Sequence, residues 1–90
     1  MTDLLYYKDP YLKQTEATVV EIRNGMVVFD KTIFYPECGG QPGDRGSFGK
    51  WGISDTRKDK DGTPLHVIEG ELPPLGTTET LLIGTIDISI

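Results

Sequence analysis

Hydrophobic and polar residues alternate along most of the chain, which is the period of a β-strand rather than of a helix. The clearest segments are residues 15–23 and 26–30, and Asn24-Gly25 joins them. Asn-Gly between two apolar runs favours a type I′ turn, because both residues tolerate a positive φ. We therefore predict a hairpin, with Val19 and Glu21 on the same face of its first strand.

Further short segments carry the same alternation, and residues 31–35 continue extended until Pro36 removes a donor from the ladder. Gly84 indicates a bulge or bend inside the last of these segments. The predicted strands are residues 46–48, 51–56, 65–69 and 78–89. About six short strands separated by turn residues predict an all-β fold, a small barrel or sandwich.

A glycine-rich stretch, residues 36–52, breaks this pattern and holds six of the 11 glycines. No regular element tolerates so many glycines, so we predict a shaped loop. Such a backbone can approach a ligand closely, and its amides can bind an anion. A tight connection at a barrel corner explains the loop equally well. The candidate loop residues are Gly39, Gly40, Gly43 and Asp44.

Composition narrows the function classes. The net charge of −5, from 14 acidic and 9 basic residues, disfavours unspecific nucleic-acid binding by this chain alone. No apolar run is long enough to span a membrane, and no signal peptide is evident. A single cysteine excludes an internal disulfide and favours the cytoplasm. One cysteine and one histidine also exclude a zinc site built from those ligands alone.

The side chains that could carry chemistry each have a structural explanation that we favour. We expect Cys38 to be a small buried residue and His66 a structural histidine, rather than a thiol–imidazole pair. Three acidic residues could gather around a cation, but a solvated turn explains them better: Asp55, Asp59 and Asp61. Four aromatic residues are expected in the core rather than as stacking surfaces: Phe34, Tyr35, Phe48 and Trp51.

Residues 32–46 resemble a known signature, T-x-F-Y-P-E-G-G-G-Q-P-G-D-x-G. It belongs to the editing domain that alanyl-tRNA synthetases share with the free-standing alanyl-tRNA editing proteins of the AlaX family. The opening residues 6–11 are also similar to the start of the free-standing members, and weaker matches follow in the same order to residue 87. Cys38 departs from the pattern, because the family usually has glycine there. If that position needs a positive φ, cysteine would be strained.

The resemblance implies a β-barrel like those of translation factors. It also implies hydrolysis of tRNA(Ala) that is mischarged with serine or glycine. The family binds zinc through H-x-x-x-H and C-x-x-x-H pairs in a C-terminal subdomain, and neither pair occurs here. Residues 1–90 therefore resemble the N-terminal half, which we expect to be inactive alone. The apolar pattern continues to Ile90, so we expect a longer protein. Its partners would be tRNA(Ala) and its own zinc subdomain, with no membrane.

The resemblance also implies two residues of the editing pocket, Thr32 and Gln41, which would select the substrate. We expect both to reach an open edge of the barrel where the zinc subdomain docks. Replacing Thr32 with valine should then weaken selection of seryl over alanyl groups more than it harms the fold. Two alternatives stay open: a non-catalytic barrel that binds RNA or protein, and an internal piece of a full synthetase that binds ATP elsewhere.

Overall fold

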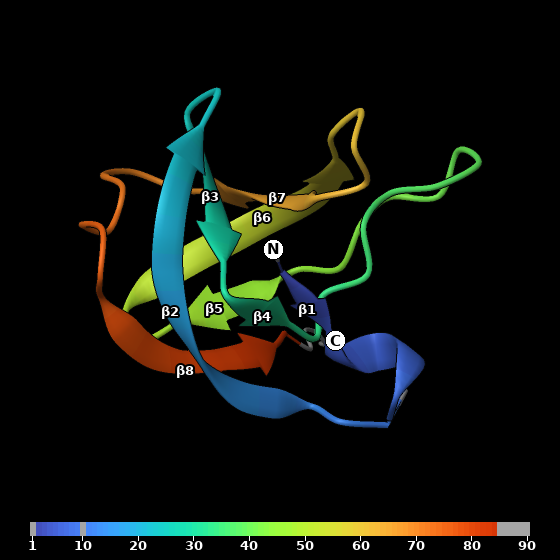
Figure 1. The fold of residues 1–90 in the computed structure, drawn as a ribbon, viewed down its shortest axis with the longest axis horizontal. Helices are drawn as coiled ribbons and strands as arrows, with labels where there is room; N and C mark the ends of the chain where they lie inside the picture. The colour runs from blue at the N-terminus through green and yellow to red at the C-terminus, as the bar shows by residue number, and fades with distance from the viewer. Residues whose placement is uncertain (1, 10, 85–90) are drawn as a thin grey trace, which may run out of the picture.

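The computed structural model describes residues 2–9 and 11–84, and Figure 1 shows their arrangement. Six antiparallel strands close into a barrel in the order β2-β3-β7-β6-β5-β8. These strands are β2 Gln14–Arg23, β3 Met26–Phe29, β5 Gly46–Phe48, β6 Trp51–Lys58, β7 Pro64–Ile68 and β8 Thr78–Ile83. The predicted all-β fold is confirmed, and its barrel form is settled by the pairing of β2 with both β3 and β8.

A two-stranded sheet beside the barrel was not predicted from the sequence. Strand β1 (Asp3–Leu4) pairs in parallel with β4 (Lys31–Thr32), and the short 3-10 helix η1 (Leu5–Tyr7) follows β1 directly. The Thr2 hydroxyl also donates to the carbonyl oxygen of Phe29 at 2.7 Å. The N-terminal segment is therefore tied to the chain where it leaves the barrel.

The first hairpin has the predicted turn but a different strand phase. Asn24 (φ 54°) and Gly25 (φ 75°) both have positive φ, as a type I′ turn requires. The β2–β3 register shifts between Val19 and Glu21, so that Glu21 lies opposite Val28. An extra residue in one strand reverses the alternation beyond it. The prediction that Glu21 shares the face of Val19 was wrong, because β2 has a bulge.

The barrel interior is filled with large apolar side chains, and the rings of Phe29 and Phe48 lie 4.6 Å apart at its centre. Of the aromatic residues expected in the core, Phe34 and Phe48 are fully buried and Trp51 packs against the core from its edge. Tyr35 is instead 46% exposed, because it follows β4 at the point where the chain leaves the barrel.

The last strand ends at Ile83, so most of the predicted extension to residue 89 lies outside the described residues. Gly84 follows it, and its N–H donates to the Arg45 carbonyl oxygen at 2.6 Å. A side chain at Gly46 would overlap the Leu82 carbonyl, so β5 and β8 meet here through glycine. In the part of the chain that the structure describes, no helix is long and apolar enough to cross a membrane.

Candidate functional site

The predicted glycine loop forms an arm that projects beyond the barrel, as Figure 1 shows. We call residues 35–44 the glycine arm. Near its tip, Cys38 and Gln41 exchange two backbone hydrogen bonds of 3.1 and 3.0 Å. Gly39 (φ 57°) and Gly40 (φ 86°) make the turn between them. Positive φ at both positions is the geometry of a two-residue hairpin turn, which explains why glycine occupies both.

The base of the arm is held firmly to the barrel. The Asp44 carboxylate accepts a hydrogen bond from the Tyr35 N–H at 2.9 Å, and the Asp44 carbonyl accepts one from the Thr56 hydroxyl at 2.8 Å. Gly43 N–H donates to the Asp55 carboxylate at 3.1 Å. A Cβ on Gly43 would overlap the backbone of Thr56, so only glycine fits there. The arm is thus fixed at its base and exposed at its tip.

The exposed part of the arm carries Gln41 and Cys38 around a shallow hollow of about 480 Å³ lined by residues 37–42. The side-chain amide of Gln41 offers both a donor and an acceptor. Cys38 is exposed, so the prediction that it is buried was wrong. Asn24 is the one non-glycine residue of the described chain with a positive φ. Cysteine is therefore not strained where the signature has glycine.

Thr32, at the end of β4, is fully buried at the centre of a chain of hydrogen bonds. Its side-chain oxygen lies 2.8 Å from His66 Nε2 and accepts a hydrogen bond from the Phe34 N–H at 3.0 Å. His66 Nδ1 lies 2.9 Å from the carbonyl oxygen of Val27, which can only accept, so Nδ1 carries the proton. Nε2 is then unprotonated and accepts a hydrogen bond from the Thr32 hydroxyl. We call Val27, His66, Thr32 and Phe34 the buried relay.

Burial keeps the histidine of this relay neutral. His66 is 0% exposed, and desolvation lowers its pKa from 6.5 to about 4, although the hydrogen bond to Val27 opposes this shift. Phe29 and Phe34 pack edge-on against the imidazole ring. His66 is therefore the structural histidine that the sequence indicated, and both of its nitrogens are used.

The two residues expected at the site are not brought together. The barrel is closed, Thr32 is 0% exposed, and Gln41 lies near the exposed tip of the arm. Within the described ranges no hydrogen bond joins Thr32 to the arm directly. On that side Thr32 bonds the N–H of Phe34, the residue that precedes the arm. The expectation that Thr32 reaches an open edge was wrong for the chain as described. Its role in selection stays a prediction.

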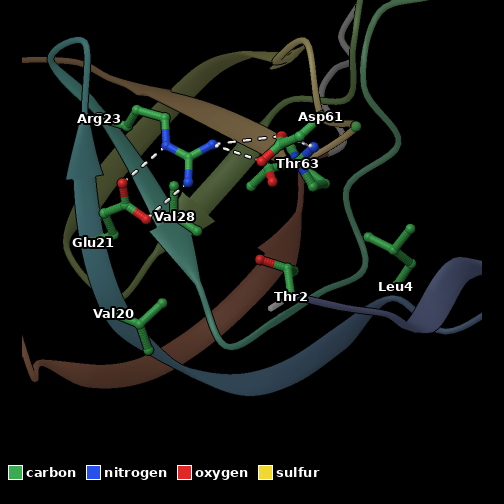
Figure 2. A pocket seen from close by; sticks show the side chains of 10 residues that line it. Thr2, Leu4, Val20, Glu21, Arg23, Val28, Asp61 and Thr63 are labelled. Carbon is green, nitrogen blue, oxygen red and sulfur yellow. Dashed lines mark hydrogen bonds and ion pairs between the residues drawn. The ribbon is translucent and has the colours of Figure 1, made fainter.

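A second concave region, with a volume of about 450 Å³, lies on the outside of the barrel. Figure 2 shows the side chains that line it. Its lining is apolar near Leu4, Val20 and Val28 and charged around Arg23. Successive residues Val20 and Glu21 both line it, because the bulge turns them to the same side. This pocket could not be predicted from the sequence, because segments far apart along the chain form it.

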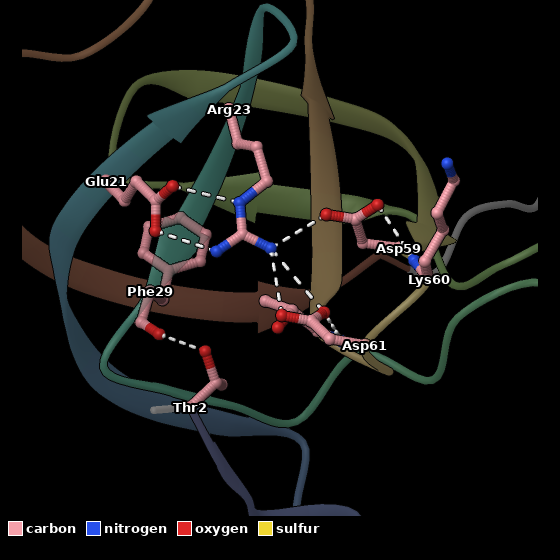
Figure 3. Close-up of polar contacts among 8 residues, drawn as sticks. Thr2, Glu21, Arg23, Phe29, Asp59, Lys60 and Asp61 are labelled. Carbon is pink, nitrogen blue, oxygen red and sulfur yellow. Dashed lines mark hydrogen bonds and ion pairs between the residues drawn. The ribbon is translucent and has the colours of Figure 1, made fainter.

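Arg23 is fully engaged by carboxylates, as Figure 3 shows. Its Nε and one terminal nitrogen bind Glu21 at 2.9 Å each, and Nη1 binds Asp59 at 2.7 Å and Asp61 at 3.3 Å. Hydrogen bonds from Arg23 hold the pKa values of Glu21 and Asp59 below their ordinary range. Three carboxylates around one guanidinium leave an excess of negative charge, which disfavours a phosphate ligand here.

The residues present do not fit the zinc ion that the family resemblance implies. Among residues 2–9 and 11–84, no three histidine, cysteine or acidic side chains gather as metal ligands. His66 has no free nitrogen, and Cys38 lies on the exposed arm. The three acidic residues expected on one turn are separated: Asp55 lies in β6 and accepts backbone N–H groups from Gly43 and Thr56, while Asp59 and Asp61 pair with Arg23.

Comparison with known proteins places this geometry in context. A family model described as tRNA synthetases class II (A) matches residues 6–88. The chain is 49% identical over 78 residues to an alanine–tRNA ligase of Korarchaeum cryptofilum. This match covers 83% of this chain and 9% of the ligase. It is 46% identical over 69 residues to the alanyl-tRNA editing protein AlaX-M of Pyrococcus horikoshii, with 77% of this chain and 32% of that protein covered. AlaX-L of the same organism is 43% identical over 86 residues, with 84% and 21% covered. The chain thus spans a third or less of the length of these relatives.

Proposed function

The chain belongs to the class II (A) tRNA synthetase family, and from that membership we propose that it is the selective, metal-free half of a hydrolase that removes wrongly attached serine or glycine from tRNA(Ala). The observation that carries the proposal is the likeness to two alanyl-tRNA editing proteins, at 46% and 43% identity. The family model matches residues 6–88, which include the glycine arm, the most distinctive feature of the sequence.

In this proposal the chemistry is divided between two parts of a longer protein. A zinc subdomain outside these residues would supply the metal, because the described residues provide no ligand set for it. The chain described here would supply selectivity. Gln41 would contact the aminoacyl end directly from the exposed arm. Thr32 would act through Phe34, whose N–H it accepts at the start of the arm.

A chimera tests this division. The segment of AlaX-M that matches this chain is replaced by residues 1–90, and deacylation of seryl-tRNA(Ala) and alanyl-tRNA(Ala) is measured. We expect the chimera to deacylate the seryl form faster than the alanyl form, while residues 1–90 alone deacylate neither. Gln41→Ala should slow both reactions, because it disturbs positioning rather than side-chain choice. Lys60→Ala, an exposed change on the β6–β7 turn, is the control. A folded, zinc-loaded chimera that deacylates neither substrate would refute the proposal.

A second candidate is supported by the 49% identity to the alanine–tRNA ligase of Korarchaeum cryptofilum. The same barrel would then be the editing part of a synthetase that binds ATP and alanine elsewhere. The two candidates differ in one measurement on the full-length protein. ATP-dependent attachment of alanine to tRNA(Ala) would support the ligase, and its absence beside rapid deacylation of seryl-tRNA(Ala) would support the free-standing editing protein.

A further inference from the structure

Three tyrosines from two distant segments pack together beside the glycine arm. The ring of Tyr6 lies 4.8 Å from the ring of Tyr7 and 4.8 Å from the ring of Tyr35, measured between centroids. Tyr6 and Tyr7 belong to η1, while Tyr35 begins the arm, and Figure 1 shows both segments on the same side of the barrel. Tyr7 is 71% exposed and Tyr35 46% exposed. We call these three residues the tyrosine platform.

The platform is uncharged, although acidic residues lie near it in the sequence. Burial raises the pKa of Tyr6 to about 12, and the neighbouring phenols add to this shift, so its hydroxyl stays protonated. The carboxylate of Asp3 pairs with Lys8 at 3.4 Å. The carboxylate of Asp44 accepts the Tyr35 N–H. The charge close to the rings is thus partly compensated, and the exposed surface is aromatic.

We propose that the tyrosine platform stacks the unpaired bases at the 3′ end of tRNA. This inference rests on the proposed function, which makes a tRNA the partner. Proteins recognise single-stranded RNA by stacking splayed bases on aromatic side chains, whereas bases inside a duplex have no free face. Tyr35 joins the platform to the base of the arm, so a strand held there would lie beside the arm whose tip carries Gln41.

Stacking also fits the charge of the chain better than phosphate binding does. The net charge is −5, so affinity cannot come from a basic stripe. Base–aromatic stacking contributes without one. A protein partner fits less well, because a stable interface buries about 800 Å² on each side and a single aromatic side chain offers about 150–250 Å² at most. Two partly exposed rings fall well short of that area.

Titration of the chain with a short single-stranded RNA ending in CCA tests the proposal. Nuclear magnetic resonance would follow the ring protons of Tyr7 and Tyr35, with a duplex of the same length as comparison. Tyr7→Ala and Tyr35→Ala should each weaken binding about 5- to 140-fold, the range expected for one lost stacked base. Tyr7→Trp should keep RNA binding at the wild-type level or improve it. Tyr11→Ala is the matched control, because Tyr11 is 84% exposed and makes no ring contact within the described residues.

We expect the ring signals of Tyr7 and Tyr35 to move with the single strand and not with the duplex, and to depend little on salt. Melting temperatures of the variants would show that the fold is kept. Absence of these shifts, equal shifts with the duplex, or equal weakening by Tyr11→Ala would each overturn the inference. If the chimera deacylates seryl-tRNA(Ala) while the platform binds no RNA, the inference fails and the proposed function stands. If the platform binds the strand but no deacylation occurs, the proposed function fails.

Discussion

Replacing Thr32 with valine should destabilise the barrel strongly, even though the two side chains are nearly equal in volume. Valine leaves no cavity, but it removes the hydroxyl at the centre of the buried relay. His66 Nε2 loses its donor and the Phe34 N–H loses its acceptor, at positions that water does not reach. The sequence alone led us to expect that this change would weaken substrate selection more than it harms the fold, whereas the buried hydrogen bonds of Thr32 predict a large loss of stability.

The size of the effect follows from the two groups left without partners. Each unsatisfied buried polar group costs about 1–3 kcal/mol, so the loss should be about 2–6 kcal/mol. A domain of 90 residues has a total stability of about 5–13 kcal/mol. Thr32→Ser keeps the hydroxyl and loses one methyl group, which should cost about 1 kcal/mol. Serine should therefore be tolerated better than the larger, better-fitting valine.

Urea denaturation and thermal melting of the three proteins would measure this order. For Thr32→Val the melting temperature should fall by at least about 8 °C, since about 1 kcal/mol shifts a domain of this size by about 4–8 °C. The ¹⁵N chemical shifts of the His66 ring should also show a protonated Nδ1 and an unprotonated Nε2 in the wild type. If Thr32→Ser costs as much as Thr32→Val, the methyl contacts rather than the hydroxyl stabilise this site, and the reasoning is refuted.

Three further measurements test other parts of the structure. The free energy of unfolding should fall as the pH drops from 6.5 to 4. The pKa of His66 is about 4 in the folded protein and 6.5 in the unfolded chain, so the unfolded chain takes up the proton first. The loss approaches about 1.4 kcal/mol per pH unit. Urea midpoints at pH 7.5 and 5 would measure this loss of stability. The His66→Gln variant should depend less on pH, and an equal dependence would contradict the explanation. Gly43→Ala should destabilise the fold far more than Gly25→Ala, because a Cβ at Gly43 overlaps the Thr56 backbone. Gly25 has open space around it and a φ of 75°, so Gly25→Ala should cost about 1–2 kcal/mol. Equal melting temperatures for the two variants would exclude this explanation. Elemental analysis should find no stoichiometric zinc in the purified chain, since one cysteine and one histidine cannot fill a site of about four ligands.

The sequence predicted the strands and the hairpin turn well, because local pattern decides both. Alternating residues form strands, and Asn24-Gly25 adopts the positive φ values that its composition favours. The bulge in β2 escaped prediction, because nothing in the local sequence of residues 19–21 requires an extra residue. A single inserted residue then moved Glu21 to the outer face.

The parts of the site that could not be predicted depend on contacts between distant segments. Thr32 and His66 are 34 positions apart, and Arg23 and Asp59 are 36 positions apart. Neither pair is close in the sequence, and only the closed barrel brings the two members of each pair together. Tyr35 shows the opposite error. It was expected in the core because it is large and aromatic, but one residue beyond Phe34 the chain has already left the barrel.

The closure of the barrel has a consequence for how the chain folds. Strand β2 pairs with β3 through its second half and with β8 through its first half, and Thr18 faces Thr78 across this seam, 60 positions away. Neighbouring strands such as β5 and β6 are joined by tight turns and can pair early, whereas the seam must wait for the largest loop to close. During synthesis, we expect an open sheet to persist until β8 has left the ribosome. A chain that stopped before Thr78 would keep unpaired edges on β2 and β5, and unpaired edges are templates for aggregation.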